Sequence, residues 1–216
     1  MISAFLRRPQ TEFIVIFVLV PVLLYLYQPD KLLMPLLWFF AFLALRMLRL
    51  HYQQGLKEEW NLAALTRAEL ARILLRFLPF AALMTAFTWF MKPDQLFIVP
   101  QTNLHLWFAI LIFYPLLSVL PQELIYRSYF FRRYMVWPVG STQRLLLNAF
   151  AFGWLHIVLH NWVAVVFSAI GSLIFTQTYL RTRSLAAVWF EHSLYGCYVF
   201  TVGLGYYFYH GVAMQL

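Results

Sequence analysis

Residues 104–126 read LHLWFAILIFYPLLSVLPQELIY, a long apolar stretch that turns polar only at its end. As a helix that rises about 1.5 Å per residue, this stretch is long enough to cross a hydrocarbon core of about 30 Å. Further apolar runs of comparable length fall near 12–28, 32–50, 70–91, 142–160, 162–180 and 184–209. The pattern predicts an all-α fold, a polytopic membrane bundle of about seven transmembrane helices that forms one domain over residues 1–216.

The composition excludes an ordinary soluble domain. Of the 216 residues, 63% are apolar and only 11% are charged, whereas about 25% are charged in a typical soluble domain. Turn signals such as Gln28-Pro29-Asp30, Pro93-Asp94 and Gly140-Ser141 separate the apolar runs. Thr66 and Glu69 have the spacing of a capping box, which predicts that the third helix starts there.

The positive charges are distributed unevenly over the predicted loops. If the apolar runs alternate in direction and Arg7 and Arg8 are cytoplasmic, only Lys31 and Lys92 of the 16 basic residues lie outside. This is the positive-inside pattern, so the amino terminus is expected in the cytoplasm. This distribution of basic residues beside the lipid bilayer accounts for the net charge of +8, so no nucleic-acid partner is expected.

Several ionisable residues fall inside the predicted spans, where a charge is costly and usually functional. They are Glu123, His156, His160, Glu191 and His192. Glu123 and Arg127 are four residues apart, which would stack the two side chains as an ion pair on one helix face. Pro121 removes a backbone hydrogen bond just before this pair, and a weakened membrane helix usually lines protein or water.

The two histidines of the fifth run, His156 and His160, would point from one helix face because they are four residues apart. This spacing is compatible with a metal site in which His156, His160, His192 and a carboxylate hold zinc and a water molecule. No HExxH or other dedicated zinc motif is present. A site without a metal or other cofactor is the leading expectation, and zinc is the alternative.

Three polar motifs lie on three different runs and read Gln122-Glu123-x-x-x-Arg127, Phe152-x-x-x-His156 and His192-x-x-x-Gly196. In this order they resemble the EExxxR, FxxxH and HxxxN motifs of the CPBP family. That family comprises membrane proteases that include CAAX prenyl endopeptidases and bacterial bacteriocin-processing or immunity proteins. The resemblance covers residues 121–200, the motif core. Two positions differ, because Gln122 stands at the family's first glutamate and Gly196 at its asparagine.

The resemblance implies a helical bundle whose cavity opens to the cytosol and cleaves a membrane-associated peptide or protein near its carboxyl end. It also implies a multi-pass integral membrane protein, expected in the bacterial inner membrane. In the family, the first glutamate and the motif-two histidine activate water, and the last histidine and the asparagine polarise the scissile carbonyl group. An amide such as Gln122 cannot take a proton at neutral pH, and Gly196 offers no side-chain donor.

The leading hypothesis is hydrolysis of a peptide bond by an activated water molecule. Glu123 would be the general base, and His156 would hold or share the proton of the water. His192 would stabilise the oxyanion, and Gln122 would orient the water. Asn161 or Tyr195 could supply the donor that Gly196 lacks, and Glu191 is a second candidate for the base. The supporting residues are Arg127, Phe152, His160, Asn161 and Glu191.

Two alternatives belong to other functional classes. Gln122 and Gly196 are also compatible with an inactive family member that keeps the fold and binds a membrane partner. A proton-coupled transporter is the other alternative, because buried glutamate and histidine residues can form a proton relay across a bundle. The hydrophobic pattern shows no inverted repeat of the kind that many transporters have.

Overall fold

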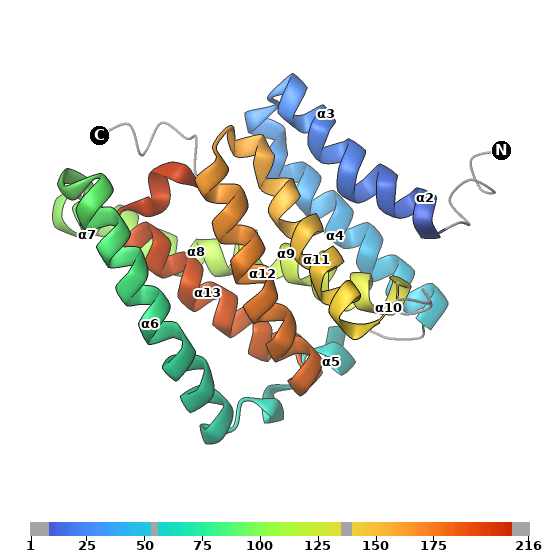
Figure 1. The fold of residues 1–216 in the computed structure, drawn as a ribbon. Coiled ribbons are helices and arrows are strands. Elements are labelled where there is room, and N and C mark those ends of the chain that lie inside the picture. Colours follow the sequence, from blue (N-terminus) through green and yellow to red (C-terminus); the bar gives the residue numbers. More distant parts are fainter. Residues whose placement is uncertain (1–8, 53–55, 135–139, 209–216) are drawn as a thin grey trace.

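The structure is a computed structural model that describes residues 9–52, 56–134 and 140–208. Helices account for nearly all of these residues, and no strand occurs among them. Figure 1 shows the long helices running between two ends of the molecule, with α10 and α5 near one end and α7 near the other. The predicted all-α architecture is confirmed.

The first two helices form a hairpin along one side of the bundle. α2 (Pro9–Phe13), the π-helical η1 (Ile14–Leu19) and α3 (Val20–Tyr27) form one continuous helix, and α4 (Asp30–Tyr52) returns along the bundle. The first helix packs through η1 on α11 (Ser141–Leu155), whereas α4 packs on α9 (Leu120–Glu123). Because the two helices pack on different neighbours, a cavity forms between them, as described below.

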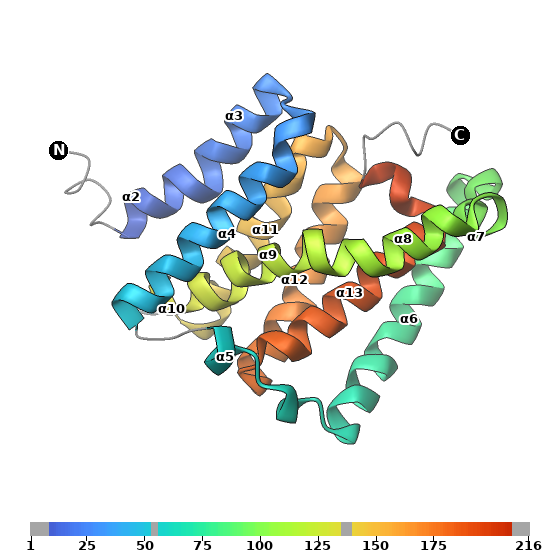
Figure 2. The ribbon, with the colours of Figure 1, turned by 180° about the vertical axis from the view of Figure 1, so that it is seen from behind.

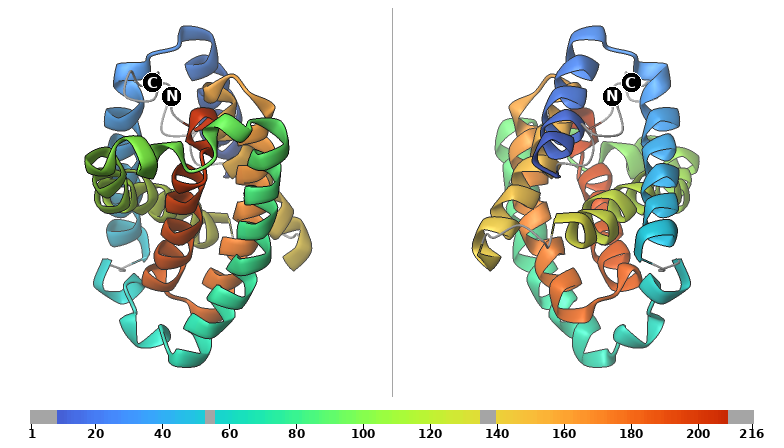
Figure 3. Two further views of the ribbon diagram at one scale, coloured as in Figure 1. Left: turned by 90° about the vertical axis from the view of Figure 1, so that its left-hand side faces the viewer. Right: turned by 90° about the vertical axis from the view of Figure 1, so that its right-hand side faces the viewer.

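The third long helix, α6 (Arg67–Met91), follows two short turns, α5 (Leu56–Glu59) and η2 (Leu62–Ala64). Thr66 caps α6 as predicted, because its hydroxyl oxygen accepts a 3.2 Å hydrogen bond from the backbone N–H of Glu69. Figure 3 shows α6 and α4 on opposite sides of α13 (Leu185–Thr201). α6 therefore forms the side wall that faces away from the first hairpin.

One long helix carries the first motif. It comprises α8 (Leu104–Tyr114), η4 (Pro115–Val119), α9, η5 (Leu124–Tyr129) and α10 (Phe130–Tyr134), and it follows the short turns η3 (Pro93–Gln95) and α7 (Ile98–Thr102). The turns η4 and η5 are π-helical. η4 lies in the turn before Pro121, where the proline lacks the N–H that would bond to Leu117 and its ring clashes with that turn. Figure 2 shows this helix crossing in front of α12 and α13. The irregularity predicted at Pro121 is therefore present.

The second and third motifs lie on the carboxy-terminal helices. α11 continues into the 3-10 turn η6 (His156–Leu159), α12 (Trp162–Thr182) returns along α11, and the turn η7 (Leu204–Tyr207) follows α13. α11 and α12 approach closely at Gly153, where an added Cβ would lie 2.8 Å from Cβ of Ala169. α13 packs on both α12 and the long helix, which brings the third motif next to the first.

Within the described part of the chain, five helices are long and apolar enough to cross a membrane. They are Pro9–Tyr27, Lys31–Tyr52, Arg67–Met91, Leu104–Tyr134 and Trp162–Thr182. This architecture is that of a polytopic integral membrane protein. α11 and α13 are shorter than these five, so the count of seven spans stays a prediction.

Candidate active site

Two adjoining cavities lie next to the three motifs. The first has a volume of about 170 Å³ and is lined by η1, α3, α4, the long helix, the end of α11, η6 and Phe208. The second has a volume of about 460 Å³ and is lined mainly by α6, α12 and α13. Tyr114, His156 and Phe208 line both cavities and therefore stand between them. The walls are mostly apolar, as is usual for a ligand site that has a few fixed polar groups.

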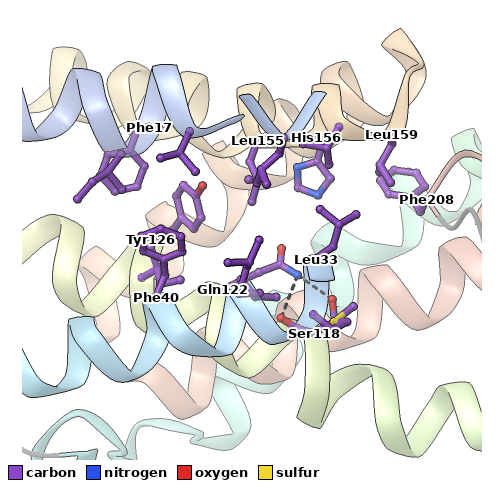
Figure 4. A pocket seen from close by; sticks show the side chains of 18 of the residues that line it. Phe17, Leu33, Phe40, Ser118, Gln122, Tyr126, Leu155, His156, Leu159 and Phe208 are labelled. Atoms are coloured by element: carbon purple, nitrogen blue, oxygen red, sulfur yellow. Dashed lines mark hydrogen bonds between the residues drawn. The ribbon is translucent and has the colours of Figure 1, made fainter. Parts of the chain in front are cut away.

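Gln122 belongs to the wall of the first cavity. Its amide nitrogen donates hydrogen bonds of 2.9 Å to the backbone oxygen and 2.8 Å to the hydroxyl of Ser118, one helical turn earlier. The amide oxygen is buried and has no hydrogen-bond partner among the described residues. Figure 4 shows the Gln122 side chain pointing into the cavity from one side and the His156 ring from the other. The free oxygen can therefore accept a hydrogen bond from a molecule in the cavity.

His156 is held by the backbone of its own helix. Its Nδ1 atom lies 2.8 Å from the backbone oxygen of Phe152, one turn earlier. Because a carbonyl oxygen only accepts, Nδ1 carries the hydrogen, and Nε2 of the neutral ring keeps its lone pair. The Phe152 ring lies 5.0 Å from the His156 ring and 5.6 Å from the His192 ring. The phenylalanine of the second motif therefore packs against both histidines.

Glu123 and His192 form a buried pair between the long helix and α13. Their Oε1 and Nδ1 atoms are 2.7 Å apart, and the second carboxylate oxygen lies 3.2 Å from Nε of Arg127. Glu123 and Arg127 are both 0% exposed. The predicted ion pair is therefore present, but Glu123 lines neither cavity, whereas His192 lines the second one. The Phe175 ring stacks on His192 with centroids 4.5 Å apart, which fixes the plane of the imidazole.

Asn148 is a site-supporting residue that the sequence analysis did not identify. Its side-chain oxygen accepts hydrogen bonds from Arg127 at 2.8 Å and from Thr176 at 2.8 Å. Its amide nitrogen donates a 2.7 Å bond to the backbone oxygen of Tyr126. A fully buried asparagine inside an apolar helix could have been the signal, since such a residue needs partners for all of its polar atoms.

His156 and His160 do not share one helix face, contrary to the expectation from their spacing. α11 ends at Leu155 and tightens into η6, and His160 adopts a left-handed conformation with φ of 54°. The His160 ring stacks on Tyr25 with centroids 4.3 Å apart, in a different pocket. No group of three or more His, Cys, Asp or Glu residues within the described ranges is arranged to hold a metal ion. The structure therefore does not bring His160 together with His156 and His192, and the zinc alternative stays a prediction.

Two other expected supporting residues lie away from the cavities. The Asn161 side chain caps α12 by accepting from the backbone N–H of Ala164, and it donates a 2.8 Å bond to the backbone oxygen of Tyr207. Glu191 pairs with Arg76 of α6 at 2.7 Å. Neither residue lines the two cavities, so the structure gives Asn161 a capping role and Glu191 a role in joining α6 to α13.

Tyr114, at the end of α8, occupies the space next to Gly196. A Cβ added to Gly196 would lie 2.4 Å from the hydroxyl oxygen of Tyr114. The Tyr114 ring is 6.5 Å from the His192 ring, and its hydroxyl makes no hydrogen bond with the described residues. The hydroxyl is therefore an available donor beside His192, at the position that the third motif leaves without a side chain.

Residues 103–198 match the protein family described as type II CAAX prenyl endopeptidase Rce1-like. The matched range contains all three motifs. It also contains Tyr114 and His156, two of the three residues that the cavities share. This match confirms the resemblance to the CPBP family. No curated protein and no solved structure gave a significant match to the chain.

Proposed function

Starting from the Rce1-like match, we propose that this membrane protein is an endopeptidase that hydrolyses a peptide bond of a membrane-associated substrate within the bilayer. One observation carries the proposal: Gln122, His156 and His192 line adjoining cavities whose other walls are mostly apolar. Apolar walls suit a substrate segment that arrives from the membrane, and the polar groups supply the chemistry.

The water-activating side of the site consists of His156 and Gln122. The neutral His156 ring has a free Nε2 lone pair that can take a proton from water as that water attacks the carbonyl carbon of the substrate. The amide oxygen of Gln122 accepts the other hydrogen of the water and so orients it. In this division of roles His156 replaces Glu123 as the general base, because Glu123 has no access to either cavity.

The oxyanion-stabilising side consists of His192 and Tyr114. Glu123 accepts the hydrogen on Nδ1 of His192 and stabilises the protonated ring, whose Nε2–H can donate to the developing oxyanion. The Tyr114 hydroxyl supplies a second donor beside it. When the carbon–nitrogen bond of the substrate breaks, His156 returns its proton to the leaving amine, which completes the hydrolysis.

A second candidate function is binding without hydrolysis. No Asp or Glu within the described ranges lines either cavity, and Gln122 stands where the resemblance implies a glutamate. A member of this kind would hold an apolar segment of a membrane partner in the same cavities. The two functions differ in one measurable respect, which is whether the bound peptide is cut.

The test is cleavage of a library of membrane-inserted peptides by the full chain in nanodiscs, followed by mass spectrometry. Wild type is compared with His156→Ala, His192→Ala and Gln122→Glu. His105→Ala is the matched control, because His105 is an exposed histidine at the start of α8 that lines neither cavity. Cleavage that survives in His105→Ala and is lost in the other two alanine variants supports the protease.

Cleavage by Gln122→Glu alone would identify a binding protein that lost its catalytic carboxylate. If neither wild type nor Gln122→Glu cuts any peptide, the endopeptidase proposal is rejected.

A further inference from the structure

The carbonyl group of Leu117 is the one that the helix irregularity at Pro121 leaves without its regular partner. In an α-helix this oxygen would accept a hydrogen bond from the N–H of residue 121, and a proline has none. A carbonyl oxygen without a donor is costly within a membrane, because lipid offers no replacement. The indole Nε1–H of Trp38, on α4, donates to the Leu117 oxygen at 3.0 Å. The first hairpin therefore supplies the hydrogen bond that the long helix lacks.

A second tryptophan binds the same turn from another helix. The indole of Trp189, on α13, donates a 2.8 Å hydrogen bond to the backbone oxygen of Pro115, the first residue of η4. Two residues span about half a turn of helix, so the carbonyl groups of Pro115 and Leu117 point to opposite sides. The Trp38 ring packs in turn on Phe42, with centroids 5.6 Å apart. η4 is therefore held by α4 on one side and by α13 on the other.

The turn that these indoles hold also carries the acceptors for Gln122. Ser118 follows Leu117 directly, and its backbone oxygen and hydroxyl accept hydrogen bonds from the Gln122 amide nitrogen at 2.9 and 2.8 Å. Because a backbone oxygen only accepts, these bonds fix the amide with its nitrogen toward Ser118 and its oxygen toward the first cavity (Figure 4). A rotation of the peptide group between Leu117 and Ser118 would move the acceptors and release the amide.

We infer that Trp38 is a positioning residue for the amide of Gln122. Trp38 is not among the described residues that line either cavity, so its indole acts through Leu117 and Ser118 and not by contact with a substrate. It also lies outside residues 103–198, so the family match gives it no role. The effect of Trp38 on hydrolysis rests on the proposed function, whereas its effect on the orientation of the amide does not.

Kinetics separate this role from a general effect on stability. Trp38→Phe keeps an aromatic ring and removes the indole donor. Trp107→Phe is the matched control, because Trp107 lies on the same long helix and its indole donates a 2.9 Å bond to Thr201 of α13, away from η4. Misplacement of a positioned group by about 1 Å can cost about 10² in rate. We therefore expect Trp38→Phe to lower kcat by about 10–100-fold at unchanged KM, and Trp107→Phe to keep the kcat of wild type.

The double variant Trp38→Phe/Gln122→Leu tests whether the indole acts through Gln122. If it does, the loss of kcat in Trp38→Phe does not exceed that in Gln122→Leu, and the double variant cleaves at the rate of Gln122→Leu alone. Losses that multiply in the double variant would overturn the inference, because Trp38 would then act by a route that avoids Gln122. Equal kcat in Trp38→Phe and wild type would overturn it as well.

The Gln122 amide can also be observed without any cleavage. The full chain is labelled with ¹⁵N in its glutamine side chains and studied by NMR in detergent micelles, where the pair of amide signals that is absent from Gln122→Leu belongs to Gln122. Trp38→Phe should shift or broaden this pair, and Trp107→Phe should leave it in place. An unmoved pair in Trp38→Phe overturns the inference. If the pair moves but wild type cuts no peptide, the proposed function fails and the positioning of the amide by Trp38 stands.

Discussion

The ring of Tyr114 fills the space that a side chain at Gly196 would need. A Cβ built on Gly196 would stand 2.3 Å from Cε1 of Tyr114, far inside van der Waals contact. The tyrosine at the end of α8 therefore fits in this position because residue 196 of α13 is a glycine. The tyrosine hydroxyl stands beside His192, where the motif of the family has an asparagine amide.

This pairing predicts that Gly196→Asn damages the protein and that a second change repairs it. Because the clash involves an aromatic ring of a tightly packed contact, we expect Gly196→Asn to lower the free energy of unfolding by about 1–3 kcal/mol. The double variant Tyr114→Ala/Gly196→Asn removes the ring and places an amide beside His192, so it should regain stability and cleavage. Thermal unfolding and peptide cleavage in nanodiscs measure both quantities. A double variant that is no better than Gly196→Asn would contradict the pairing.

Loss of the Tyr114 hydroxyl should slow hydrolysis without weakening substrate binding. A donor that acts on the developing oxyanion contributes to kcat rather than to KM, and removal of one such donor typically costs about 10²–10³ in rate. We therefore expect Tyr114→Phe to lower kcat by about that factor and to leave KM unchanged.

Tyr195→Phe provides the comparison, because Tyr195 also lines the second cavity and its buried hydroxyl has no partner among the described residues. Its ring packs among Phe77, Phe80 and Phe175. If Tyr195→Phe lowers kcat and Tyr114→Phe does not, Tyr195 is the donor and the role given to Tyr114 is wrong.

The helical architecture was predictable because apolar runs of sufficient length leave few other solutions in a membrane. The Glu123–Arg127 pair was predictable for a similar reason, since both residues lie within one helix at a spacing of four. The prediction that His156 and His160 share one helix face was wrong for a local reason. α11 ends at Leu155 and the chain tightens into η6, so a spacing of four no longer places the two residues on one face.

Contacts between distant helices could not be read from a single sequence. Tyr114 and Gly196 meet only because α13 packs on α8, and no local pattern marks either residue as a partner of the other. The position of the cavities was equally hidden, because it depends on which halves of α4 and α6 face their neighbours.

Breaking the buried ion pair at Arg127 should destabilise the protein strongly. Arg127→Met leaves the carboxylate of Glu123 without its neighbouring charge and the oxygen of Asn148 without one donor. A buried charge that loses its partner typically costs about 3–5 kcal/mol. Thermal unfolding in detergent should therefore show a clear loss for Arg127→Met. The double variant Glu123→Gln/Arg127→Met should recover part of it, and an unchanged midpoint in the single variant would contradict the role of the pair.

Removal of metal ions should leave hydrolysis unchanged. His156 and His192 are turned to different partners, Phe152 and Glu123, and His160 lies in another pocket. Cleavage measured before and after incubation with a strong chelator should therefore give the same rate. Loss of cleavage that added zinc restores would show that a metal takes part and that the proposed role of His156 as general base is wrong.

Gln122→Glu should raise the rate of hydrolysis by supplying a carboxylate at the water. The new side chain would face His156 across the first cavity, and a positioned general base typically contributes about 10²–10⁴ in rate. The backbone oxygen of Ser118 accepts a hydrogen bond from Gln122 in the wild type, and a carboxylate cannot donate one, so we expect a stability loss of about 1–3 kcal/mol.

Gln122→Leu is the matched control, since it keeps the approximate size and removes the acceptor that orients water. Faster cleavage by Gln122→Glu and slower cleavage by Gln122→Leu than by wild type would support the division of roles between Gln122 and His156. If Gln122→Leu cleaves as fast as wild type, Gln122 does not orient the water, and His156 would have to act without it.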